Sequence, residues 1–310
     1  MFAEENLMNR EDLRTVGAIR IASLGLVALL IVASGANAQE SFPTIKEKVA
    51  LVQKFQPVLR SYPGASPDIL GIRTGMSIAN AEAIAAKSYG GTTKPFVWHS
   101  SDSLIYSPGN FTIESRPFVR DVSFSGSKGI MLDMLDLHFG SPVTGDTLLG
   151  MTRKISYSPT RMQKTPSIST IRALLIKKYG PTSYQSQTEG GGLTVGWVFG
   201  QTKRLVCKTR DCTGGHFAGV PGVFSSGAGH LDKDDLLTPC GVTAGDPNTF
   251  RIDAKIDARK SAKTEVSSVT VSIWDTAVCV NDGMEAKKQL TAAAVKYWKA
   301  TYKPPPGPKL

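Results

Sequence analysis

The sequence predicts an α+β fold: two repeated helix-on-antiparallel-sheet modules, followed by a disulfide-stapled C-terminal β-hairpin and a helix. Residues 77–91 (SIANAEAIAAKSYGG) and 167–181 (SISTIRALLIKKYGP) align without gaps, and strand-like runs follow each of them. Residues 250–259 and 266–274 alternate apolar and polar side chains, which is typical of the two strands of a hairpin. One helix and a few strands bury little surface alone, so we expect the two modules to share a core.

The N-terminus predicts export. Arg14 and Arg20 precede a short apolar run (IASLGLVALLIVASG), and small residues at Ala36 and Ala38 follow it. This is the pattern of a secretory signal peptide over residues 1–38, with cleavage after Ala38 and a periplasmic or secreted mature chain. An uncleaved membrane anchor is the alternative. No second apolar run approaches twenty residues, so we expect no transmembrane span after cleavage.

The predicted elements follow in chain order. Residues 39–63 are expected to form an N-terminal helix, because Val49, Val52, Phe55 and Leu59 recur at helical spacing. The remaining boundaries are 64–150 for the first module, 151–206 for the second, 207–302 for a disulfide-containing loop, hairpin and C-terminal helix, and 303–310 for a disordered tail.

Aromatic residues and lysines indicate which side chains are expected in the core and which are expected to face water. Trp98, Trp197 and Trp274 lie in strand-like runs and are predicted to be core residues. The C-terminal helix is expected to pack through Leu290, Ala294 and Tyr297. Its lysines, Lys287, Lys288, Lys296 and Lys299, then face water. The alternative is that this lysine face lies on an anionic membrane surface.

The cysteines all lie in the C-terminal third, at Cys207, Cys212, Cys240 and Cys279. An even number of cysteines in an exported chain favours two disulfides. Cys240 precedes the predicted hairpin and Cys279 follows it, so a Cys240–Cys279 bond would close its base. A Cys207–Cys212 bond would then close a tight local loop.

The segment richest in reactive side chains is 207–240, which is also rich in glycine. Its candidate catalytic residues are His216, His230 and Asp232. Zinc ligation by Cys207, Cys212, His216 and Cys240 is disfavoured, because exported cysteines are usually oxidised. The acidic residues near Asp232 lack the glycine and distal glutamate of an EF-type calcium loop. We therefore expect no metal and no cofactor, and interpret the segment as a binding loop.

A shorter segment, MLDLHFG, places Asp136 and His138 on one strand face, opposite Leu135, Leu137 and Phe139. We interpret this polar pair as part of a solvated strand face.

Residues 71–90 (GIRTGMSIANAEAIAAKSYG) resemble the opening of small envelope modules of the SmpA/OmlA type, the BamE-like family. Gly75, Met76, Ser77 and Gly90 carry the likeness. A similar unit occurs in tandem in the β-lactamase-inhibitor-protein-like fold class. The resemblance implies a non-enzymatic protein-binding module of the envelope and transfers no site residue. SmpA-type proteins are small lipoproteins, whereas this chain is larger and has no lipidation cysteine.

Charge and missing motifs define the expected function. The chain carries a formal net charge of +10, which predicts an anionic surface or an envelope protein as partner. Its basic residues are scattered, which favours the alternative of a generally basic surface without a specific partner and predicts no specific nucleic acid. No zinc-protease, nucleophile-elbow, P-loop or dinucleotide motif occurs. The sequence thus predicts an exported, non-catalytic binding protein of the bacterial cell envelope. The alternatives are an exported hydrolase or metal-dependent enzyme using residues 207–240, and a secreted effector or inhibitor.

Overall fold

The computed structural model describes residues 46–56, 67–90, 96–107, 112–129, 131–158, 165–188, 190–200, 204–206, 229–230 and 250–301. Its main element is a nine-stranded sheet. The strands are β2 (Phe96–Asp102), β5 (Phe118–Lys128), β6 (Met131–Phe139), β7 (Leu148–Tyr157), β8 (Tyr184–Gln187), β9 (Leu193–Phe199), β10 (Arg204–Leu205), β12 (Phe250–Arg259) and β13 (Ala262–Asp275). They lie in the order β10-β9-β12-β13-β7-β6-β5-β2, with β8 beside β9, and every pair is antiparallel.

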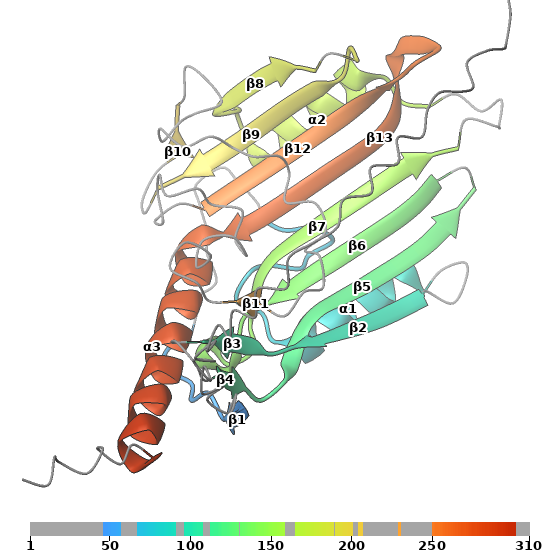
Figure 1. Ribbon diagram of the computed structural model, residues 1–310. Coiled ribbons are helices and arrows are strands. Elements are labelled where there is room, and N and C mark those ends of the chain that lie inside the picture. The colour runs from blue at the N-terminus through green and yellow to red at the C-terminus, as the bar shows by residue number, and fades with distance from the viewer. Residues whose placement is uncertain are drawn as a thin grey trace, which may run out of the picture. The chain divides into compact units, whose positions relative to one another are not determined.

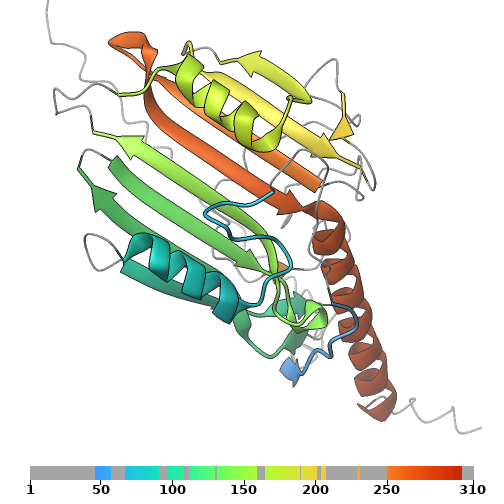
Figure 2. The same cartoon turned by 180° about the vertical axis from the view of Figure 1, so that it is seen from behind.

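Two helices, α1 (Ile78–Tyr89) and α2 (Ile168–Tyr179), cover one and the same face of this sheet (Figures 1 and 2). Each begins at a capping serine. The Ser77 hydroxyl accepts a hydrogen bond from the Asn80 N–H, and the Ser167 hydroxyl accepts one from the Thr170 N–H. The two helices end in buried tyrosines, which anchor their last turns on the sheet.

The main core lies between these helices and the sheet, because alternate strand residues point toward the helices. The buried strand residues that share this cluster with α1 and α2 include Val122, Phe124, Leu135, Leu137, Met151, Val195, Trp197, Phe199, Ile252, Ala254, Ile256, Val269 and Ile273. We call the opposite side of the sheet, which faces away from α1 and α2, the open face; the name refers to the helices only, because Arg251, Ser272 and Trp274 on this side are buried.

A second, four-stranded sheet packs against the long helix α3 (Thr276–Thr301). Its strands are β1 (Lys46–Val49), β4 (Thr112–Ser115), β3 (Leu104–Tyr106) and β11 (Gly229–His230), in that order. Leu290 and Ala294 of α3 are buried against Leu104 and Ile113 of this sheet. The helix begins where the Asp275 carboxylate accepts a hydrogen bond from the Val278 N–H, so Asp275 is its N-cap.

The predicted fold class is wrong in two respects. There are no separate modules with an appended hairpin, because β7 and β13 pair along seven registered residue pairs and join all nine strands in one antiparallel sheet. The hairpin β12–β13 lies inside this sheet, between β9 and β7, and the ladders on both sides hold it in place. No disulfide joins two described residues, since Cys207, Cys212 and Cys240 lie outside the described part. Among the described residues Cys279 is disulfide-bonded, and the predicted pairing of the four cysteines stays a prediction.

The predicted N-terminal helix over 39–63 is also wrong where it is described. Residues 46–49 form β1, which pairs in parallel with β4, and residues 50–56 are not helical. The apolar residues that suggested a helix serve different surfaces: Val49 and Phe55 pack on the α3 cluster, whereas Val52 is 61% exposed. The predicted boundary between residues 150 and 151 falls within β7.

Several local predictions are confirmed. The hairpin is β12–β13, and the apolar residues of its first strand, Phe250, Ile252, Ala254 and Ile256, are buried. Arg251 and Asp253, which alternate with them, are buried as well. The C-terminal helix begins at Thr276 and packs through its predicted apolar residues.

The three tryptophans that were predicted to be core residues differ in burial. Trp197 and Trp274 are core residues, as predicted. Trp98 is 48% exposed, so its assignment to the core is wrong.

Candidate functional site

Two rows of paired strand residues, which include most of the polar side chains discussed below, cross the open face of the sheet. Strand residues directly opposite each other share a face, so the register defines each row. One row runs through Asp121, His138, Gly150 and Trp274 on β5, β6, β7 and β13. The next row runs through Trp98, Ser123, Asp136, Thr152 and Ser272.

The first row holds an oriented imidazole. His138 Nδ1 lies 2.7 Å from Asp121 Oδ1, and the side chains are only 14% and 20% exposed. An ionised carboxylate only accepts hydrogen bonds, so His138 donates through Nδ1 and its neutral form carries the lone pair on Nε2. The ring stacks on Trp274 at 4.9 Å between centroids, with 19° between the planes. His138 is therefore held on two sides, and is not the solvated residue that the sequence suggested.

Gly150 makes room for this stack. A β-carbon at position 150 would lie 2.3 Å from Cε3 of Trp274, which is far inside van der Waals contact. The glycine therefore fixes the depth of the indole, and through it the position of His138.

The second row is internally hydrogen-bonded. The Ser123 hydroxyl donates to Asp136 Oδ1 at 2.7 Å, and the hydroxyls of Thr152 and Ser272 lie 3.0 Å apart. These cross-strand pairs satisfy one another, so they form a rigid polar surface.

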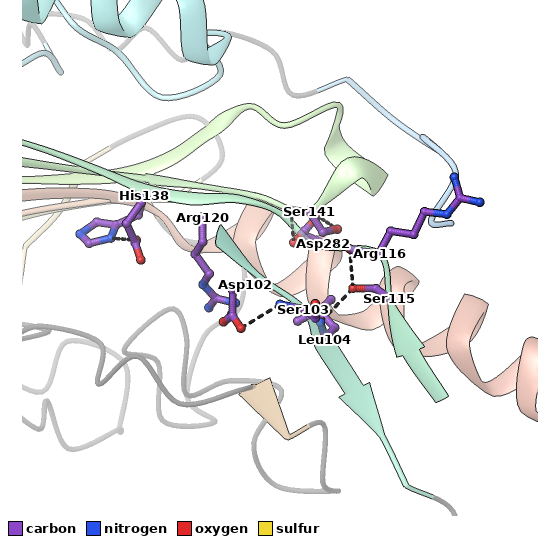
Figure 3. Close-up of polar contacts among 10 residues, drawn as sticks. Asp102, Ser103, Leu104, Ser115, Arg116, Arg120, His138, Ser141 and Asp282 are labelled. Atoms are coloured by element: carbon purple, nitrogen blue, oxygen red, sulfur yellow. Dashed lines mark hydrogen bonds and ion pairs between the residues drawn. The ribbon is translucent and has the colours of Figure 1, made fainter. Parts of the chain in front are cut away.

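A buried carboxylate links the sheet to α3 just beyond the end of β6 (Figure 3). The Ser141 N–H donates to Asp282 Oδ2 at 3.1 Å, and the Ser141 hydroxyl donates to Oδ1 at 2.8 Å. Burial raises the pKa of Asp282, while the bonds from Ser141 and Thr144 and the charge of Arg120 oppose that rise. Arg120 also pairs with Asp102 at 3.6 Å. This cluster joins β5, the Ser141 turn and α3, so we assign it a structural role.

Four apolar side chains stand exposed at the β2 end of the open face. They are Phe96 (67% exposed), Trp98 (48%), Leu132 (47%) and Met134 (38%), which we call the β2–β6 patch. Register places Phe96 and Met134 on either side of Ser125, and Leu132 beside Ser127. Phe96 and Met134 are thus two strand spacings apart, about 10 Å.

Most of the predicted site lies outside the described residues. This holds for His216, Asp232, Cys207, Cys212 and Cys240. His230 is described in its backbone alone, where it pairs in parallel with Ile105 of β3. Cys279 is buried beside Leu149, Val278 and Val280. The geometry of the predicted catalytic group therefore stays a prediction.

Local sequence patterns did not predict the His138–Asp121 pair or the β2–β6 patch. Alternation correctly placed Asp136 and His138 on one face, but the partner Asp121 lies seventeen residues earlier, on β5. Only the register of β5 on β6 brings the two side chains together.

Metal-binding and membrane-spanning features are not found in the described part of the chain. It contains no group of three or more His, Cys, Asp or Glu side chains arranged to hold a metal ion. None of its helices combines the length and the apolar character needed to cross a bilayer.

Comparison with protein-family models, with curated proteins and with solved structures finds no match to this chain.

Proposed function

We propose that this chain is an exported, non-catalytic binding protein of the cell envelope that contacts a protein partner through the β2–β6 patch. The observation that carries this proposal is the exposure of Phe96, Trp98, Leu132 and Met134 together on the open face. Scattered exposed apolar residues are ordinary, but adjacent large ones mark interaction sites. Export is proposed from the signal-peptide pattern of residues 1–38.

The composition of the patch supports a protein partner. Phe96 and Trp98 are aromatic, and aromatic side chains are enriched among the residues that dominate protein interfaces. The hydrogen-bonded row through Ser123 and Asp136 lies beside them and offers a polar rim. A central apolar cluster with a polar border is the usual anatomy of a protein–protein contact.

The edge strand supports the same conclusion. β2 is the last strand in the order of the sheet, and its sequence, FVWHSSD, contains no lysine, arginine or proline. Those residues commonly protect edge strands from pairing. Val97, which points to the other face, is 39% exposed as well. A partner that adds a strand to β2 would cover both faces of this edge.

Site-specific photo-crosslinking tests the proposal. A benzophenone amino acid is placed at position 98 in the mature chain, and a matched probe is placed at Leu174, which is 57% exposed on α2. Cells that make each form are irradiated and the envelope fraction is analysed. We expect one discrete protein adduct from position 98, competed by unlabelled wild type, and none from position 174. Equal adducts from both positions, or none from position 98, would refute the assignment.

The oriented imidazole favours a second candidate, an exported hydrolase. Asp121 and Trp274 hold His138 as catalytic bases are held. A hydrolase that uses His138 should lose its activity against a panel of ester, amide and glycoside substrates in His138→Gln. If the wild type hydrolyses none of the panel, this candidate has no support.

A further inference from the structure

The exposed side of α3 combines apolar and basic side chains. Leu290 and Ala294 face the small sheet, and the residues on the opposite side of the helix are open to solvent. Met284 is 57% exposed, Val295 is 47% exposed and Trp298 is 49% exposed. Their spacing of eleven and three residues places them on one stripe, about 21 Å long at 1.5 Å per residue.

Lysines occupy the same stripe and its two borders. Lys288 and Lys299 lie on it, because each is four residues beyond Met284 or Val295. Lys287 and Lys296 lie to either side. The only acidic residue from position 284 to the end of α3 is Glu285, which lies 3.5 Å from Lys288. That glutamate is 22% exposed against 78% for the lysine, so it offsets only part of the charge.

We propose that this side of α3 docks on an anionic phospholipid surface. The charge is complementary: four lysines against one glutamate favour a negatively charged bilayer. The side chains also suit the interface, because the long lysine stems lie along apolar contacts while the ammonium groups reach the headgroups. Trp298 lies in the last turn of the helix, and tryptophan prefers the boundary between acyl chains and water.

The helix would lie on the membrane and not cross it. Its other side is occupied by the core with the small sheet, and no described helix is apolar enough to span a bilayer. Binding of this kind combines modest apolar insertion with electrostatic attraction, so it is reversible and sensitive to salt. This surface shares no residue with the β2–β6 patch, so a test of membrane docking does not depend on whether the proposed function is correct.

Vesicle binding tests the proposal on the full mature chain. The probe is a vesicle of phosphatidylglycerol and phosphatidylcholine in equal parts, compared with pure phosphatidylcholine, in 0.1 M and 0.5 M salt. The test variant is Lys288→Glu/Lys299→Glu. The matched control is Lys87→Glu/Lys260→Glu, which makes the same charge change at two exposed lysines on α1 and on the β12–β13 turn.

We expect binding to the anionic vesicles alone, weakened by high salt. Each lysine near an anionic surface strengthens binding about fivefold, so reversing two of them should weaken it at least tenfold. The control pair should change binding less than about threefold. A blue shift of tryptophan emission should accompany binding of the wild type and disappear in Trp298→Phe.

Three results would overturn the proposal: no binding to anionic vesicles at 0.1 M salt, equal losses in both double variants, or a blue shift that persists in Trp298→Phe. Binding to a DNA 20-mer with the same dependence on Lys288 and Lys299, without vesicle binding, would instead assign the surface to an acidic polymer.

Discussion

Replacing Gly150 by alanine should destabilise the open face without removing any polar atom. The added methyl carbon would lie 2.3 to 2.7 Å from three atoms of the Trp274 ring. Carbon atoms prefer separations of 3.5–4.0 Å, so the ring or the strand must move by about 1 Å. Trp274 is 4% exposed and stacks on His138, so the space for that movement is small.

The magnitude follows from two opposing effects. Overpacking in a tight core costs about 1–3 kcal/mol of unfolding free energy. Replacing glycine by alanine restricts the unfolded chain and returns about 0.4–1 kcal/mol. We therefore expect Gly150→Ala to lose about 1–2 kcal/mol. Gly190→Ala is the control, because no heavy atom lies within 4 Å of an added methyl there and φ is outside the left-handed range.

Urea unfolding, followed by tryptophan fluorescence, measures both variants. The unfolding midpoint of Gly150→Ala should fall below that of the wild type, and that of Gly190→Ala should equal or exceed it. In addition, the imidazole NMR signals of His138 should shift in Gly150→Ala alone. If Gly150→Ala is as stable as Gly190→Ala and those signals are unchanged, then Gly150 does not position the stack.

Three further predictions concern stability. Leu290→Ala should cost about 2–5 kcal/mol, because Leu290 is fully buried between α3 and the small sheet; Val295→Ala, at 47% exposure, should cost far less in the same urea titration. Tyr89→Phe should cost about 1 kcal/mol by removing the 2.9 Å bond to Asp133, and a loss above 3 kcal/mol would contradict this estimate. Burial raises the pKa of Asp282, so its contribution to stability is complete at low pH and declines as pH rises through the folded pKa. The wild type should accordingly lose stability relative to Asp282→Asn between pH 3.5 and 7, and a constant difference would count against the raised pKa.

Local patterns predicted the elements whose signals lie within a few residues. The aligned segments 77–91 and 167–181 predicted α1 and α2. In the structure each helix begins after its first serine, whose hydroxyl satisfies a free N–H group of the first turn. Alternation over 250–259 predicted β12 and its buried residues. For residues 46–49 the local pattern was misleading. The apolar spacing fits a helix, but these residues pair with β4 and form a strand. Pairing with a segment more than sixty residues away leaves no trace in a local pattern.

The exposure of Trp98 at the candidate site also could not be predicted from local patterns. Alternation states which residues share a strand face, but both faces of a strand look alike until a helix covers one of them. Once α1 and α2 cover one side, Trp98 and Phe96 stand exposed on the other.

The two repeated helices, the alternating strands and the basic C-terminal helix could thus be predicted from the sequence, because each depends on neighbours along the chain. The tertiary structure sets the pairing of β7 with β13 and the contact of Asp121 with His138. It also decided which side of α3 faces water. Those features depend on register and packing between segments distant in sequence, where many arrangements satisfy the same local preferences and burial selects one.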